Sequence, residues 1–190
     1  LKPKNCYGEP NVVLLTPGPL NSAYYEHTYL ADTMGIELVQ GSDLYVEDGL
    51  TYMMTTVGPK KIDVIYRRID DKFLDPLSYD NSSLIGIPGL FDSYKSNNLT
   101  IASAPGSGIA DDKAIYAYLP KIIKFYLGEN PILSNIKTFS CQKDDEKKYV
   151  LENIQKLVIK EVHGAGGYGM LIGDRASNCL LYTSDAADDR

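Results

Sequence analysis

The sequence predicts an α/β fold, in which short buried strands alternate with amphipathic helices. Short apolar runs, the first at residues 11–15, recur between stretches whose apolar residues have helical spacing. Glycine, proline and aspartate residues stand between these segments, where turns are expected. Strands that alternate with helices are typical of a sheet with helical crossovers. The hydrophobic content of 44% is enough for an ordinary packed core.

The first half of the chain contains most of the predicted strands. The spacing at 22–34 predicts a helix, and Gly35 stands where a C-cap belongs. A second strand is expected at 36–39. Residues 43–56 predict a β-hairpin, because they contain an Asp-Gly pair that suits a tight turn with positive φ.

One more strand–helix–strand segment follows in this half. A strand at 62–66 leads into Arg67 and Arg68. A short helix is expected at 90–95, followed by a strand at 99–102.

The second half predicts a long helix that begins after two aspartates. The charges of Asp111 and Asp112 suit the positive end of a helix dipole. We expect this helix to reach Leu127, with a kink near Pro120, and to end at Gly128. The remaining expected elements are a strand at 136–140, a charged helix at 145–155, a strand at 157–162 and a strand at 170–172.

Composition and charge exclude several classes of protein. The net charge of −6 argues against a nucleic-acid-binding surface, which would be basic. No apolar stretch is long enough to span a membrane, and no signal-peptide pattern is visible in the residues given. The three cysteines are widely spaced without a C-x-x-C pair, which predicts a reducing, cytoplasmic location and no structural zinc site.

The two ends of the chain look unlike natural termini. The last twelve residues, 179–190, resemble translated read-through of a sequencing adapter, and Leu1 is not a start methionine. We therefore expect residues 1–178 to be a window from a longer protein, and we set the tail apart from the fold.

The most informative segment is a glycine-rich loop between two apolar runs. Four glycines lie within six residues, at Gly164, Gly166, Gly167 and Gly169. Glycine lets backbone N–H groups approach phosphate oxygens, and its entropic cost is justified by such a close approach. Lys160 lies in the preceding strand, so its ammonium group can neutralise a phosphate from that side.

Two other interpretations of this loop stay open. Three of the glycines fit the G-x-G-x-x-G pattern of dinucleotide-binding proteins, but that pattern requires a helix after the loop. The apolar run that begins at Met170 is strand-like, which favours a strand–loop–strand flap instead. The other alternative is a glycine-rich hairpin without a ligand.

Four stretches together carry a family resemblance. They are residues 16–27, 63–71, 104–118 and 160–169, and they are spread over nearly the whole span of residues 11–173. In this order they resemble the circularly permuted ATP-grasp proteins of the second type, which are related to glutathionylspermidine synthase and eukaryotic glutathione synthase.

The resemblance implies a Rossmann-like substrate subdomain at 1–103, followed by part of an ATP-grasp nucleotide-binding subdomain at 104–178. It also implies ATP-dependent ligation of a carboxylate to an amine through an acyl phosphate. By this resemblance Lys160 and Lys113 contact the nucleotide. Mg²⁺ is implied as well, held by a Glu-x-Asn pair. Glu152-Asn153 lacks that spacing, so we expect the metal ligands to lie outside this chain.

Arg67 and Arg68 are the candidate substrate-binding residues. Ligands of open α/β sheets bind beyond the carboxyl ends of strands, and a guanidinium holds a carboxylate or phosphate through two hydrogen bonds. Successive strand residues face opposite sides, so we expect only one arginine to reach the site. The alternative is an ion pair with Asp70, Asp71 or Asp75.

Three further polar positions have simpler alternatives. The loop that starts at Thr16 leads to a helix N-terminus that either binds an anion or is only capped by Asn21 or Ser22. His27 is expected to be an ordinary packed or surface histidine. His163 borders the glycine loop, so we expect it to contact nucleotide or substrate.

The function predicted from these observations is that of an ATP-dependent carboxylate–amine ligase, with small-molecule carboxylate and amine substrates and with neither nucleic acid nor membrane as partner. The chain alone is expected to be inactive, because parts of the longer protein are missing. Two alternatives stay open: a nucleotide-binding module without catalysis, and a dinucleotide-binding oxidoreductase.

Overall fold

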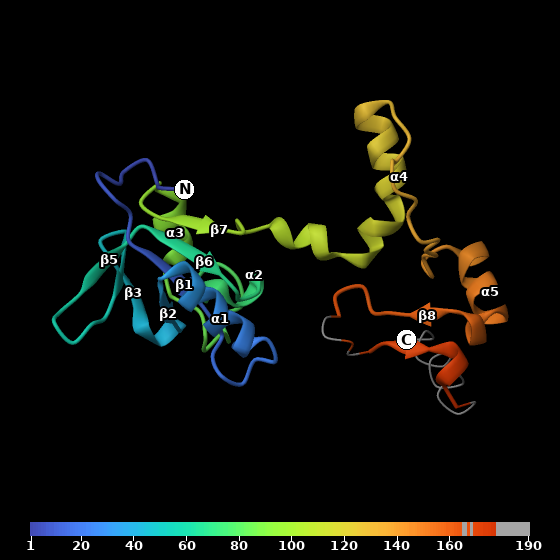
Figure 1. The fold of residues 1–190 in the computed structure, drawn as a ribbon, viewed down its shortest axis with the longest axis horizontal. Helices are drawn as coiled ribbons and strands as arrows, with labels where there is room; N and C mark the ends of the chain where they lie inside the picture. The colour runs from blue at the N-terminus through green and yellow to red at the C-terminus, as the bar shows by residue number, and fades with distance from the viewer. Residues whose placement is uncertain (165–166, 168, 178–190) are drawn as a thin grey trace. The chain divides into compact units, whose positions relative to one another are not determined.

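The computed structural model describes residues 1–164, 167 and 169–177. The chain divides into two compact units, residues 1–108 and residues 109–190 (Figure 1). The first unit has an α/β fold with a parallel sheet, as the sequence predicts. The two units are described separately.

A four-stranded parallel sheet forms the centre of the first unit, in the order β2-β1-β6-β7. The strands and the crossover helix are β1 (Val12–Leu15), α1 (Tyr24–Met34), β2 (Glu37–Val39), β6 (Val64–Arg67) and β7 (Thr100–Ala102). From β1 the chain passes through α1 to β2 on one side. It later returns to β6 and β7 on the other side. The strand order therefore reverses between β1 and β6.

The core of this unit lies around the two central strands. Strands β1 and β6 are apolar at nearly every position, as expected for strands covered on both faces. Leu15 and Ile65 are fully buried. The helices α2 (Asp71–Leu74) and α3 (Leu90–Lys95) add Leu74 and Leu90 to the same core.

A three-stranded antiparallel sheet is the second layer of strands in this unit. It consists of β3 (Leu44–Glu47), β4 (Leu50–Met53) and β5 (Lys60–Ile62), and a 3₁₀ turn, η1 (Gly41–Asp43), precedes it. Asp48 and Gly49 have φ of 51° and 73°, which confirms the predicted hairpin turn.

The prediction of a single strand at 62–66 is wrong, because Asp63 separates two strands there. The chain leaves the antiparallel sheet at Ile62 and enters the parallel sheet at Val64. The buried Asp63 carboxylate accepts the N–H of Asn11 at 3.0 Å and pairs with Lys61 at 2.9 Å. This carboxylate therefore satisfies polar groups at the point where the chain changes sheets.

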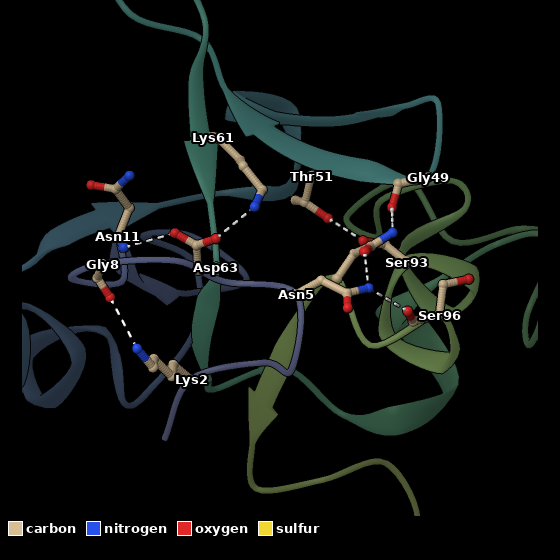
Figure 2. Close-up of polar contacts among 11 residues, drawn as sticks. Lys2, Asn5, Gly8, Asn11, Gly49, Thr51, Lys61, Asp63, Ser93 and Ser96 are labelled. Atoms are coloured by element: carbon tan, nitrogen blue, oxygen red, sulfur yellow. Dashed lines mark hydrogen bonds and ion pairs between the residues drawn. The ribbon is translucent and has the colours of Figure 1, made fainter.

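Polar side chains join the two sheets at the amino ends of the parallel strands (Figure 2). Asn5 donates to Asn98 at 2.8 Å, and Asn98 donates to the carbonyl of Gly49 in the hairpin turn at 3.0 Å. Thr51 and Ser93, both buried, share a hydrogen bond of 3.1 Å. These hydrogen bonds lie within the protein, and they connect segments far apart in the sequence at this edge of the sheet.

The second unit contains two helices and a short hairpin. They are α4 (Lys113–Leu127), α5 (Asp144–Glu152), β8 (Val158–Ile159) and β9 (Leu171–Ile172), with 3₁₀ turns η3 (Ile154–Lys156) and η4 (Gly173–Arg175). The 3₁₀ turn η2 (Ser107–Asp111) spans the boundary between the two units. Strands β8 and β9 pair antiparallel on either side of the glycine loop. The predicted strand–loop–strand arrangement is thereby confirmed, and the helix that a dinucleotide fingerprint requires does not follow the loop.

Helix α4 continues through Pro120 and ends at Gly128, which has a φ of 71°. Proline lacks the N–H that would bond the carbonyl of Tyr116, and the Asn135 side chain lies 3.5 Å from that carbonyl instead. The strand predicted at 136–140 is wrong, because this segment has no regular structure and Ile136 is 80% exposed. Its apolar residues have no neighbouring strand to pair with in the described part of the chain. No helix of the described residues is both long and apolar enough to cross a membrane.

Candidate functional site

The candidate site of the first unit lies at the carboxyl ends of β1 and β6. These two neighbouring strands mark the reversal of strand order, which is where open α/β sheets bind ligands. Thr16 follows β1, while Arg67 ends β6 and Arg68 follows it. The backbone N–H of Arg68 bonds the carbonyl of Leu15 at 2.9 Å, so the two segments lie side by side.

Arg67 points into the protein and uses its whole guanidinium there. Its side chain is only 7% exposed and pairs with Asp71. Its Nε donates to the carbonyl of Ser103 at 2.9 Å, and one Nη donates to the carbonyl of Ile69 at 3.0 Å. The other Nη lies 3.4 Å from the Ser107 hydroxyl. For Arg67 the structure therefore has the ion pair that the sequence left open as an alternative.

Arg67 and Asp71 together hold the loop that follows β7. Asp71 accepts the N–H of Gly106 at 3.0 Å, while Arg67 bonds the carbonyl of Ser103. Ser103 and Gly106 have φ of 61° and 89°, so this loop turns through backbone conformations that need support. The pair thus fixes the shape of the 103–107 loop.

Arg68 points the other way and remains partly exposed. It forms an ion pair with Glu26 in the first turn of α1, with side-chain exposures of 30% for Arg68 and 56% for Glu26. The opposite directions of Arg67 and Arg68 follow from the alternation of side chains along a strand. Arg68 is therefore the arginine that a ligand at this edge can reach.

A buried histidine lies beneath this edge, and sequence reasoning gave it no special place. His27 is 2% exposed, and its Nδ1 lies 2.8 Å from the hydroxyl of Thr16, which accepts the N–H of Gly18 at 3.2 Å. Burial lowers the pKa of His27 below its ordinary value, Arg68 lowers it further, and Glu26 opposes this. A neutral His27 thus connects α1 to the loop after β1.

The candidate site of the second unit brings together the start of α4 and the glycine loop. Lys113 donates its ammonium to the carbonyl of Gly164 and its backbone N–H to the carbonyl of Val162 at 3.3 Å. Asp112 caps α4 by accepting the N–H of Ala114 at 2.8 Å. Lys113 and Gly164, which were predicted separately, are therefore neighbours.

The other predicted residues of this site are more open. His163 is 85% exposed, with Nδ1 at 3.9 Å from the Asp112 carboxylate. Lys160 is exposed and has no hydrogen-bond or ion-pair partner within the described residues. Gly167 and Gly169 have positive φ of 80° and 65°.

One of these glycines lies close to a neighbouring side chain. A Cβ on Gly169 would lie 2.3 Å from the Glu161 carboxylate, so the backbone approaches that side chain closely. Gly166, also predicted to contact phosphate, lies outside the described residues. The positive φ of Gly167 and Gly169 favours glycine at both positions of the loop.

Comparison with known proteins identifies the family. A family described as a circularly permuted ATP-grasp matches residues 2–188. The chain belongs to this family. Membership in a circularly permuted ATP-grasp family is therefore confirmed, while the second type and the relation to glutathionylspermidine synthase stay predictions. The match extends into residues 179–190, whose adapter origin stays a prediction and which lie outside the described residues.

Relatives of this ATP-grasp chain are longer proteins. An uncharacterized protein of Synechocystis sp. is 51% identical over 168 residues, which are 88% of this chain and 35% of the relative. An uncharacterized protein of Mycobacterium tuberculosis strain H37Rv is 50% identical over 173 residues, 91% of this chain and 31% of the relative. A Frankia alni protein named "Putative glutamate--cysteine ligase 2-3" is 40% identical over 174 residues, 92% of this chain and 20% of the relative.

ATP-grasp proteins generally bind ATP and Mg²⁺, and the described residues fit these two groups unequally. Lys113 and Lys160 supply positive charge near the glycine loop, which suits nucleotide phosphates. Within residues 1–164, 167 and 169–177, no group of three or more His, Cys, Asp or Glu side chains could hold a metal ion. The position of the magnesium ligands stays a prediction.

Proposed function

We propose that this ATP-grasp chain belongs to an ATP-dependent carboxylate–amine ligase that works through an acyl phosphate. The observation that carries the proposal is the meeting of Lys113 with Gly164 at the start of the glycine loop. Family membership and the name of the Frankia relative support an ATP-dependent ligase. The chain spans about a third of the length of its first relatives, so the activity is proposed for the longer protein.

The two subdomains expected from the sequence have separate tasks in this proposal. Residues 1–103 are a Rossmann-like substrate subdomain, and residues 104–178 are part of the ATP-grasp subdomain with the glycine flap. The reversal of strand order between β1 and β6 supports a substrate site in the first. The β8–β9 hairpin supports a phosphate-covering flap in the second.

Lys160, Lys113 and the loop glycines hold the nucleotide phosphates. Bound ATP supplies the phosphoryl group that activates the carboxylate. Lys160 has no partner among the described residues, so its ammonium group is available to a phosphate oxygen. Lys113 draws the carbonyl of Gly164 toward α4 and thereby orients the loop. The chain contributes mainly by positioning groups and screening charge, which is how phosphoryl transfer is generally catalysed.

Arg68 binds the substrate carboxylate, while Arg67 supports the neighbouring loop. Both were candidates, and the 7% exposure of Arg67 against 30% for Arg68 favours this division. The substrates are then a small-molecule carboxylate and an amine. Mg²⁺ ligands in another part of the longer protein, and a cytoplasmic location, remain predictions.

The test is Lys160→Ala in the full-length protein that contains this chain. We expect loss of ADP release that depends on both ATP and substrate, measured by a coupled assay. Lys156→Ala replaces an exposed lysine of the same unit and should leave the rate unchanged. Near-wild-type turnover of the Lys160 variant would overturn the ligase assignment. A wild-type protein that binds ATP but releases no ADP would favour the non-catalytic nucleotide-binding module.

A further inference from the structure

The ion pair between Glu26 and Arg68 is the most exposed pair of opposite charges at the carboxyl edge of the parallel sheet. Its partners come from different elements, the first turn of α1 and the end of β6. Both elements adjoin the point where strand order reverses, the usual position of a ligand in such sheets. The pair therefore lies where the proposed substrate site is.

Much of the hydrogen-bonding capacity of this pair is unused. Only one Nη of Arg68 and one carboxylate oxygen of Glu26 take part in the contact. Within the described residues, the Nε and the other Nη of Arg68 donate to nothing, and the second oxygen of Glu26 accepts nothing. In contrast, the adjacent Arg67 donates hydrogen bonds from all three of its side-chain nitrogens to groups inside the protein.

The neighbouring ionisable groups add no net charge beside the pair at neutral pH. His27, next to Glu26 in α1, is buried, and its pKa is lowered by burial and by Arg68, so it adds no positive charge at neutral pH. Arg67 is neutralised by Asp71. One guanidinium and one carboxylate thus face solvent side by side. A half-exposed ion pair contributes about 1 kcal/mol or less to stability, so its geometry adjusts to a ligand at little cost.

We infer that Glu26 and Arg68 together recognise the zwitterionic head of an α-amino acid. Arg68 receives the α-carboxylate on its unused N–H groups, and Glu26 accepts the ammonium group on its unused oxygen. This inference rests on the proposed function and narrows it, because the carboxylate substrate becomes an amino acid or a peptide with a free amino acid end. It assigns Glu26 a role in specificity.

The test measures binding of two probes to the full-length protein by calorimetry, in the absence of ATP. The probes are L-glutamate and N-acetyl-L-glutamate, which keeps both carboxylates but lacks the ammonium group. We expect L-glutamate to bind at least about tenfold more tightly, since an ion-paired hydrogen bond is among the stronger polar contacts. Arg68→Met should weaken both probes by at least about tenfold.

Glu26→Gln decides between the possible roles of this carboxylate. We expect it to weaken L-glutamate about tenfold and to leave N-acetyl-L-glutamate unchanged, which removes the preference. Glu37→Gln, at an exposed glutamate of β2, should preserve the preference.

Two outcomes would overturn the inference. Tighter binding of both probes by Glu26→Gln would mean that Glu26 only blocks Arg68. No preference in the wild-type protein, or no binding of either probe, would mean that the pair does not recognise this zwitterion. Neither outcome affects the ADP-release test of Lys160, so failure of this inference and failure of the ligase proposal are separable.

Discussion

Two adjacent arginines at the end of β6 have opposite environments, so replacing each of them should change the stability of the protein by a different amount. Arg67→Met removes the cation from a nearly buried pair and leaves Asp71 and four backbone or hydroxyl acceptors without it. We expect a loss of about 3 kcal/mol in the free energy of unfolding, measured in urea. Arg68→Met breaks only an exposed pair, and its loss should stay below about 1 kcal/mol. Equal losses would contradict the division of roles between the two arginines.

His27 should make stability depend on pH. Its pKa in the folded protein lies below the ordinary value of 6.5, mainly because of burial. The unfolded chain therefore binds this proton at a higher pH than the folded chain does. The stabilising contribution is complete above pH 6.5 and is lost as the pH falls below it, with a slope of up to about 1.4 kcal/mol per pH unit.

Urea unfolding of the wild-type protein and of His27→Gln between pH 5 and 7.5 measures this slope. We expect the slope to become smaller in the variant. His163→Gln is the matched control, because that side chain is 85% exposed, and it should keep the wild-type slope. An unchanged slope in His27→Gln would exclude His27 as its source.

At the scale of elements, one glycine allows α2 to pack against the segment that leads to α3. A Cβ on Gly86 would lie 2.2 Å from the carbonyl oxygen of Phe73 and 3.0 Å from that of Leu74. We expect Gly86→Ala to reduce the free energy of unfolding by about 2 kcal/mol, because backbone atoms would have to move. Gly108→Ala places its Cβ 3.5 Å from Asp71, an ordinary contact, and should change stability by less than about 0.5 kcal/mol.

Local signals predicted most elements of the first unit. The apolar run of β1, Gly35 with a φ of 65° and the Asp48-Gly49 turn each depend on neighbouring residues alone. The break at Asp63 escaped prediction, because that residue is fixed by Asn11, 52 positions away. The strand expected at 136–140 failed because an apolar run forms a strand only beside a partner strand.

The candidate sites were likewise predictable where neighbouring residues determine them and unpredictable where distant residues do. The glycine loop and the two arginines were visible as sequence patterns, and strand alternation predicted that only one arginine reaches the edge. Which one does so depends on Asp71 and on the carbonyl of Ser103, 36 residues away. The Thr16–His27 contact likewise joins a loop to a helix, and no local pattern specifies it.

At the scale of the whole molecule, burial is distributed unequally between the units. Every buried hydrophobic residue among the described ones belongs to residues 1–108, except Val150. Helix α4 contains no buried residue, although most of its positions are apolar. Since apolar burial is the main favourable term in folding, the second unit should open at a lower free energy than the first.

Limited trypsin digestion followed by mass spectrometry tests this inequality. We expect early cleavage after the exposed Lys121 and Lys124 in α4 and late cleavage after Lys60 and Lys72 in the first unit, although all four lysines are exposed. Because cleavage requires local opening, its order reports the stability of each unit and not the accessibility of the side chain. The surviving fragment should therefore contain the parallel sheet with Arg67 and Arg68. Simultaneous cleavage in both units would contradict the lower free energy of opening inferred for the second unit.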